Sequence, residues 1–227
     1  MSGSLHLRFG PMFSGKTTWL DGELNEFARN GWSCLKIVHA NDKKRLTDAL
    51  VGAPGATDAP VPTDAPVPTA VPVPTADTTL KSSGYTHNLH AKALDPRITV
   101  VFTDTLAACA IDMYSIIAID EAQFFPDLLA TVKIWVTTKH LLVVGLDGNS
   151  QKERFGAVLD LIPLADEACK VVAKCGYCMA ELKEDQRFHG SLLNLPAPFS
   201  KRLAADQTEI LVGGADKYVA TCRFHHG

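Results

Sequence analysis

The order of apolar and polar positions predicts a strand, a helix and a second strand at the start of the chain. Residues 5–9 alternate between apolar and polar side chains, which is typical of a strand with one buried face. After a glycine-containing loop, apolar residues between Thr17 and Phe27 recur at helical spacing, and Gly31 ends the helix. Residues 34–38 predict the second strand. This order is a βαβ unit and indicates a parallel sheet.

Three later apolar runs, at residues 98–103, 115–119 and 141–146, predict further strands. The last two lack alternation, as expected for strands of a parallel sheet that helices cover on both faces. From Cys169 onward the pattern changes to short segments with paired cysteines. We therefore expect an α/β nucleotide-binding domain over residues 1–168 and a small second domain over residues 169–227.

A proline-rich repeat interrupts the first domain. The hexapeptide at residues 57–62 recurs at 63–68 and, slightly altered, at 69–74. With almost no large side chains it cannot pack a core, so we expect a disordered insertion over about residues 52–80. A hexapeptide β-helix is the alternative, but proline at alternate positions would remove the amide donors that its ladders need.

Composition and charge narrow the class of protein. Hydrophobic residues make up 46% of the 227 positions and charged residues 21%, which excludes wholesale disorder. The net charge of −3 gives no positive field for nucleic acid or an anionic membrane. No apolar run approaches the ~20 residues of a membrane span, and residues 1–4 do not begin a signal peptide. We expect a soluble, cytoplasmic protein without nucleic-acid or membrane partners.

The loop between the first strand and helix fits the phosphate-binding motif G-x-x-x-x-G-K-[ST]. Its glycines let backbone N–H groups converge on phosphate oxygens at a helix N-terminus. Lys16 would reach the β- and γ-phosphates, and the Thr17 hydroxyl would bind Mg²⁺. A chance match in a strand–helix turn is the alternative, and the complete motif in its complete context argues against it. The candidate residues are Gly10, Pro11, Met12, Phe13, Ser14, Gly15, Lys16 and Thr17.

Two acidic residues, Asp120 and Glu121, follow the apolar run at 115–119. In open α/β sheets the ligand lies at the carboxyl ends of the strands, where this pair would stand. An aspartate there typically holds the nucleotide's Mg²⁺, and the glutamate could accept a proton from an attacking hydroxyl. The alternative is a solvated acidic pair at a strand end.

Two C-x-x-[CH] pairs in the second domain predict a zinc site. Three thiolates and one imidazole suit tetrahedral Zn²⁺, and four protein ligands would make the site structural, with no water to activate. Unligated thiols are the alternative, and His226 could replace the second pair's histidine. The candidate ligands are Cys175, Cys178, Cys222 and His225.

Taken together, these motifs resemble the type II thymidine kinases of the cytosolic and poxviral kind. The phosphate loop at residues 10–17 includes their Pro-Met-Phe, and residues 120–127 resemble their acidic motif, with Ala122 where glycine is usual. The segments at 146–156 and at 213–218, the latter followed by Cys222, are similar to two further family segments. The match covers most of residues 5–50, 85–178 and 199–225.

The resemblance implies a RecA-like P-loop parallel sheet flanked by helices, and a zinc-binding domain whose lasso loop closes over thymidine. It also implies ATP, Mg²⁺ and structural Zn²⁺, dTTP as a feedback inhibitor, and a homotetramer. Glu121 matches the family's catalytic base, and Asn88, Asp120 and Gln123 join the nucleotide-binding residues. The implied nucleoside contacts, for which ordinary core packing is the alternative, are Met12, Phe124, Ser150, Phe155, Ser200, Arg202, Glu209, Ile210, Leu211, Val212, Gly213 and Tyr218.

The sequence departs from the family pattern at several positions. Asn88 stands where aspartate is usual, and Ser150 where an aromatic residue is usual. His225 replaces a cysteine, which is a mild change because imidazole is a good zinc ligand. Besides the proline repeat, about fifteen residues around 185–198 are inserted into the expected lasso.

The sequence thus predicts a kinase that transfers the γ-phosphate of MgATP to the 5′-hydroxyl of thymidine, with deoxyuridine as a further candidate substrate. A nucleic-acid-stimulated motor ATPase is the alternative, because residues 120–123 also resemble a helicase acidic box. The short chain, the negative charge and the absence of a visible second motor lobe argue against it. A third reading, a non-catalytic nucleotide-binding or assembly protein, is disfavoured by the retained Lys16, Asp120 and Glu121.

Overall fold

The computed structural model describes residues 2–41, 80–81, 94–184, 195–203 and 217–227. Almost all of the expected insertion at 52–80 lies outside the described residues. So do Asn88 and the five nucleoside-contacting residues expected at 209–213.

A seven-stranded sheet forms the centre of the molecule, in the order β3-β4-β2-β5-β6-β1-β7. All its strands run parallel except the two-residue edge strand β3. Because β1 and β5 both run parallel to β6, which lies between them, the strand before the phosphate loop and the strand before the acidic pair end at the same edge. The predicted RecA-like α/β fold is confirmed. The strands are β1 (Ser4–Phe9), β2 (Cys34–His39), β3 (Leu80–Lys81), β4 (Thr99–Thr103), β5 (Ile116–Asp120), β6 (His140–Gly145) and β7 (Glu167–Lys170).

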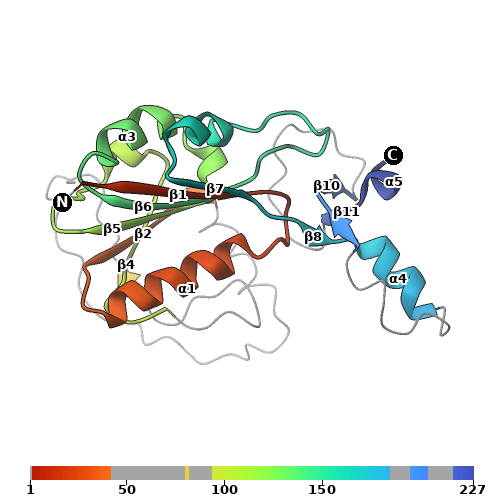
Figure 1. Cartoon of the computed structure of the whole chain (residues 1–227), viewed down its shortest axis with the longest axis horizontal. Coiled ribbons are helices and arrows are strands. Elements are labelled where there is room, and N and C mark those ends of the chain that lie inside the picture. The colour runs from red at the N-terminus through yellow and green to blue at the C-terminus, as the bar shows by residue number, and fades with distance from the viewer. Residues whose placement is uncertain (1, 42–79, 82–93, 185–194, 204–216) are drawn as a thin grey trace, which may run out of the picture.

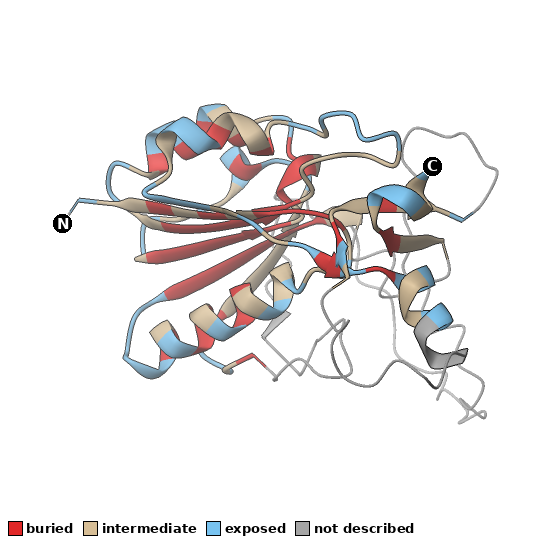
Figure 2. Ribbon diagram, turned by 45° about the vertical axis from the view of Figure 1, so that its right-hand side comes forward, coloured by how far each residue is buried: buried red, intermediate tan, exposed pale blue. Residues whose placement is uncertain are grey.

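Helices cover both faces of the sheet (Figure 1). Helix α1 (Lys16–Arg29) packs Leu20 and Leu24 on one face, where they meet apolar side chains of β5 and β6. Helix α3 (Leu128–Trp135) and a 3₁₀ helix (Val158–Leu164) cover the other face. Every residue of β2 and β5 is buried, which explains their unalternating sequences (Figure 2). Two shorter 3₁₀ helices span Leu106–Ala108 and Ala122–Phe124.

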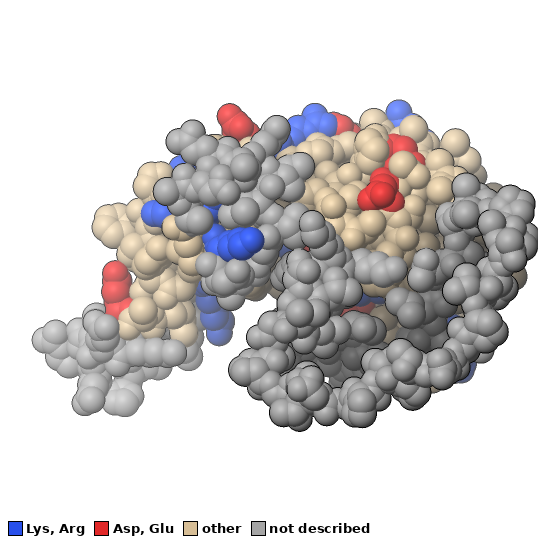
Figure 3. Space-filling model, turned by 180° about the vertical axis from the view of Figure 1, so that it is seen from behind, with Lys and Arg blue, Asp and Glu red and all other residues tan. Residues whose placement is uncertain are grey.

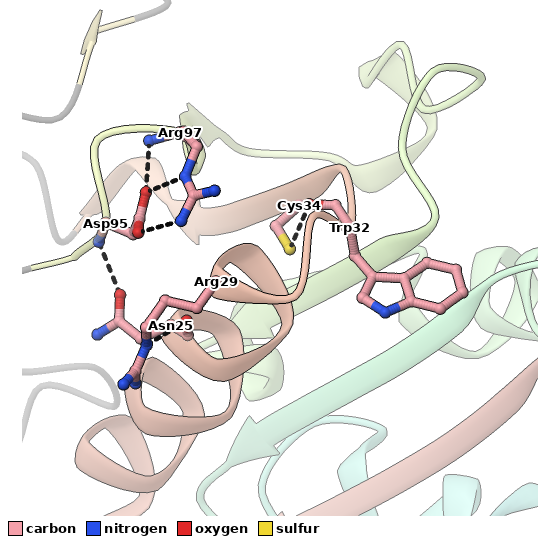
Figure 4. A network of polar contacts seen from close by, with 6 residues as sticks. All are labelled: Asn25, Arg29, Trp32, Cys34, Asp95 and Arg97. Atoms are coloured by element: carbon pink, nitrogen blue, oxygen red, sulfur yellow. Dashed lines mark hydrogen bonds and ion pairs between the residues drawn. The ribbon is translucent and has the colours of Figure 1, made fainter.

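A polar network fastens the segment before β4 to the end of α1 (Figure 4). The Asp95 backbone amide donates to the Asn25 side-chain oxygen at 2.7 Å. The Arg97 guanidinium donates twice to the Asp95 carboxylate, at 2.8 Å each, and lowers the pKa of that carboxyl to about 2. The network fixes where the chain enters the sheet at β4.

The C-terminal residues form a small lobe beside the carboxyl edge of the sheet (Figure 1). Its buried apolar residues number only four in the described part of the chain: Ala173, Cys175, Ala197 and Ala220. Because β7 pairs with β1, the main sheet extends two residues past the expected boundary at residue 168. Pro196 and Ala197, within the expected insertion, pair with β8. The elements are β8 (Ala173–Lys174), α4 (Gly176–Glu184), β9 (Pro196–Ala197), β10 (Phe199–Arg202), β11 (Tyr218–Thr221) and α5 (Arg223–His226).

None of the helices in the described residues has both the length and the apolar character that crossing a membrane requires.

Candidate active site and metal centre

The predicted phosphate loop connects the end of β1 to the start of α1. Two of its glycines are required by geometry. Gly15 has a φ of +79°, in the left-handed region that glycine adopts without strain. At Gly10, an added β-carbon would lie 2.1 Å from the Val171 carbonyl oxygen. The loop is therefore shaped by the sequence that follows β7 as well as by its own residues.

The Lys16 ammonium group folds back over the loop. It donates to the Pro11 carbonyl oxygen at 2.6 Å and to the Ser14 hydroxyl at 3.2 Å. Burial lowers the pKa of Lys16, and this effect outweighs the opposing attraction of Glu121, Asp120 and Asp147. The Lys16 ammonium therefore lies at the loop, where three carboxylates attract it electrostatically.

Asp120 joins the start of α1 to the end of β5. The Thr17 hydroxyl donates to Asp120 Oδ1 at 3.1 Å, and the Glu121 backbone amide donates to the same oxygen at 3.0 Å. The second oxygen, Oδ2, lies 3.2 Å from the ammonium of Lys36 in β2. The structure thus places together the threonine and the aspartate that the sequence motifs assigned to one metal ion.

Glu121 has a left-handed backbone, with φ +54° and ψ +42°. For a residue with a side chain this conformation costs about 1–3 kcal/mol, so the surrounding structure must hold it. Glu121 Oε2 accepts a hydrogen bond from Gln123 Nε2 at 2.6 Å, and Gln123 Oε1 accepts one from the Leu146 amide at 2.9 Å. Because Leu146 is a donor, the amide group of Gln123 must turn its NH₂ toward Glu121. Gln123, expected among the nucleotide contacts, is buried and bonds to protein groups in this way.

We predict that Gln123→Met lowers kcat by about 10- to 100-fold. The substitution keeps the side-chain length, releases the Glu121 carboxylate and leaves the partly buried Leu146 amide without its acceptor, which costs about 1 kcal/mol or more of stability. Steady-state kinetics and thermal unfolding measure the two effects. A variant that unfolds at a lower temperature but keeps wild-type kcat when folded would show that Gln123 supports the fold only.

An aromatic pair adjoins the glutamate. The Phe124 and Phe155 rings pack edge to face, with centroids 5.5 Å apart, and both side chains are half-buried. The Phe124 amide donates to the Glu121 carbonyl oxygen at 3.1 Å, so the carboxylate and the Phe124 ring belong to one turn. Ser150 lies in a neighbouring turn at 149–153, where its hydroxyl donates to Gln151.

A hydrogen bond connects the small lobe to the phosphate loop. The Met12 backbone amide donates to the buried Ser200 hydroxyl of β10 at 2.9 Å. On the paired strands β10 and β11, Arg202 Nη2 lies 3.3 Å from the Tyr218 hydroxyl. Through Ser200, the paired strands β10 and β11, which also contain Arg202 and Tyr218, are therefore attached to the loop that contains Met12.

Four side chains of the small lobe converge on one point: Cys175, Cys178, Cys222 and His225. Their ligand atoms all lie within 4.8 Å of one another. His225 Nδ1 lies 3.2–3.5 Å from the three sulfur atoms, and its Nε2 lies 3.1 Å from Glu181 Oε1. The His226 ring instead packs edge to face against Phe199, which separates the two histidines.

Comparison with known proteins identifies the family. A family profile described as thymidine kinase matches residues 3–62 and 74–226. The chain belongs to the thymidine kinase family. The unmatched residues 63–73 of this family member fall within the proline-rich repeat.

Cellular and viral thymidine kinases are similar to this family member over nearly its whole length. Cytosolic thymidine kinase of Gallus gallus is 29% identical over 224 residues, which cover 97% of this chain and 75% of that protein. The Homo sapiens cytosolic enzyme is also 29% identical, with 97% and 72% covered. Thymidine kinase of Fowlpox virus (strain NVSL) is 29% identical, with 98% and 96% covered.

Sequence reasoning missed two residues that contact the site of this thymidine kinase family member. Lys36 lies within the strand predicted at 34–38, and the structure buries every residue of that strand, where a lysine requires an ionic partner. Glu181 follows Cys178 by three residues, which places it on the adjacent turn of α4, but no motif marked it.

Proposed function

We propose that this protein transfers the γ-phosphate of MgATP to the 5′-hydroxyl of thymidine, giving dTMP. The observation that carries the proposal is the position of Glu121. On one side, its backbone amide contacts Asp120, which is bonded to Thr17 at the end of the phosphate loop. On the other side, it shares a turn with Phe124, whose ring packs against Phe155. Membership of the thymidine kinase family supports the same substrates.

Each residue of the loop edge has a role in this proposal. The loop amides and Lys16 bind the phosphates, and Thr17 and Asp120 hold Mg²⁺, whose charge screens the phosphate oxygens during transfer. Glu121, fixed by Gln123, accepts the proton of the 5′-hydroxyl. Since positioning and electrostatics supply most of such catalysis, the rigid attachment of Glu121 is part of the mechanism.

The thymine pocket in this proposal combines both lobes. Phe124 and Phe155 enclose the base from the sheet side, and Met12 lies where the loop meets Ser200. Arg202 and Tyr218 complete the described part of the pocket, and residues 209–213 would supply backbone hydrogen bonds. The proposal includes Asn88 at the phosphates and Ser150 near the nucleoside.

We also propose that the Cys₃His cluster holds a structural Zn²⁺. With zinc–sulfur bonds of about 2.3 Å, the edges of a tetrahedral site are ~3.8 Å between sulfurs and slightly less between sulfur and nitrogen. The Cys178–Cys222 sulfur distance is 3.8 Å, and the sulfur–Nδ1 distances are 3.2–3.5 Å, so the cluster fits this ion. Glu181 would orient His225 by accepting from its Nε2.

The resemblance to type II thymidine kinases supports further proposals about organisation and control. They are a nucleotide-binding domain followed by a zinc-binding lasso domain, a homotetramer, feedback inhibition by dTTP, and a cytoplasmic location. Light scattering after size-exclusion chromatography tests the tetramer, and inhibition by dTTP at subsaturating thymidine tests the feedback.

A coupled assay tests the proposed activity. Purified protein with MgATP is given thymidine, deoxyuridine or deoxycytidine, and ADP and nucleoside monophosphate are measured. We expect turnover with thymidine and none with deoxycytidine. ATP hydrolysis that single-stranded DNA stimulates and thymidine does not would favour the motor ATPase.

Charges of both signs are interspersed over the described surface seen in Figure 3, which does not favour binding to a nucleic-acid backbone.

A further inference from the structure

A buried ionic network lies directly behind the acidic motif. The Lys36 ammonium lies 2.5 Å from Asp21 Oδ1 and 3.2 Å from Asp120 Oδ2. All three side chains are at most 7% exposed. Burial disfavours the charged form of Lys36, but attraction to Asp120 and Asp21 outweighs this effect and raises the pKa of Lys36.

The network closes a ring through three elements of the fold. Thr17 and Asp21 are four residues apart on α1 and therefore share one face of the helix. Thr17 donates to one oxygen of Asp120, and Asp21 holds the lysine that contacts the other oxygen. Lys36 itself lies on β2, which pairs with β5. The ring thus couples the start of α1 to the strand that ends in Asp120.

The ring fixes how the Asp120 carboxylate can turn. Oδ1 receives the Thr17 hydroxyl and the Glu121 amide, and Oδ2 faces Lys36. Rotating the carboxylate would break contacts at both oxygens at once. A buried ion pair is weak evidence for stability, because apolar residues of similar volume often serve as well. The arrangement is better explained by its effect on Asp120.

We propose that Lys36, held by Asp21, is a positioning residue that keeps Asp120 Oδ1 directed at Thr17. Its action rests on the proposed function, since Thr17 and Asp120 are the residues assigned there to Mg²⁺. One lysine between two aspartates also leaves the network with a net charge of minus one. The site therefore keeps its attraction for a divalent cation while the orientation of Asp120 is fixed.

The paired variant Asp21→Leu/Lys36→Met separates positioning from charge. It replaces the ion pair with apolar side chains. The remaining carboxylate, Asp120, gives the network the same net charge of minus one as in the wild type. We expect kcat to fall about 10- to 100-fold, as for a misplaced catalytic group, with the thymidine KM within twofold of wild type. Calorimetry with a non-hydrolysable ATP analogue should show that the affinity gained on adding Mg²⁺ is reduced at least threefold.

A double-mutant cycle with Asp120→Asn distinguishes positioning from general support of the fold. If Lys36 acts through Asp120, adding the paired substitution to Asp120→Asn lowers kcat by no more than a further twofold. Losses that multiply, or a paired variant with wild-type kcat and wild-type Mg²⁺ dependence, would overturn the proposal. Asp95→Leu/Arg97→Met, which removes an ion pair before β4, is the matched control and should leave the Mg²⁺ dependence unchanged.

A single variant tests the proposal if the paired variant does not fold. Asp21→Asn replaces the carboxylate that holds Lys36 with a neutral amide, which is a weaker acceptor for the ammonium, and leaves the network with no net charge. The Mg²⁺ concentration for half-maximal analogue binding should then rise severalfold. An unchanged Mg²⁺ requirement would refute the proposal. Analogue binding needs no thymidine, so a protein that fails to phosphorylate thymidine would contradict the proposed function without deciding the role of Lys36.

Discussion

Replacing Glu121 with glutamine should lower kcat by about 10²- to 10⁴-fold, the range that a general base contributes. The amide keeps the size of the side chain and can still accept the hydrogen bond that Gln123 donates. It cannot take the proton of the 5′-hydroxyl. Because the aromatic pair and the small lobe are untouched, the thymidine KM should stay within severalfold of wild type.

Steady-state kinetics of Glu121→Gln, with both substrates varied, measures this effect. Glu26→Gln is a matched control, since Glu26 is an exposed glutamate on α1, and it should keep wild-type kcat. A Glu121→Gln protein that binds both substrates and turns over within tenfold of wild type would remove Glu121 as the base.

Loss of zinc should damage thymidine binding more than ATP binding. Cys178→Ser removes one side chain of the cluster. In its described part the small lobe buries only four apolar residues, three of them alanines, so we expect it to depend on the proposed metal for folding. Ser200, Arg202 and Tyr218 lie on the two strands that precede Cys222. We expect the thymidine KM to rise about tenfold or more and the ATP KM to rise less than threefold, because β1 and α1 hold both ends of the phosphate loop.

Metal analysis and the two KM values check this prediction. Cys169→Ser, in β7 outside the cluster, is the matched control and should keep both zinc and activity. Glu181→Gln should weaken zinc binding about 10- to 100-fold without removing a ligand, as is typical of a group that orients a ligating histidine. Freshly purified wild-type protein without zinc, or equal increases in both KM values, would contradict the proposal.

Much of the fold could be predicted because its signals are local. The first βαβ unit, the phosphate loop and the acidic pair at the end of β5 each depend on a few neighbouring residues, and the structure has them within one or two positions of the expected bounds. The two C-x-x-[CH] pairs are also local signals, because each short turn brings two ligands together by itself. Only the geometry of the cluster distinguishes His225 from His226.

The features of the site that could not be predicted from the sequence depend on contacts between residues far apart in the chain. Nothing near Lys36 shows that its side chain reaches Asp120, because that depends on the pairing of β2 with β5 and the rotation of α1. The direction of the Gln123 amide is set by a backbone donor 23 residues later. The hydrogen bond from Met12 to Ser200 likewise requires both lobes to be in place.

The left-handed backbone at Glu121 has a consequence for how variants of this protein would be selected. Glycine adopts this conformation without strain, so Glu121→Gly would relieve part of the cost that glutamate carries there while removing the carboxylate. A library ranked by thermal resistance alone would therefore enrich Glu121→Gly, a substitution that stabilises the fold and removes the proposed base. Directed evolution of this protein toward thermal stability therefore has to include an activity screen at every round, because at Glu121 the most stable residue and the active residue differ.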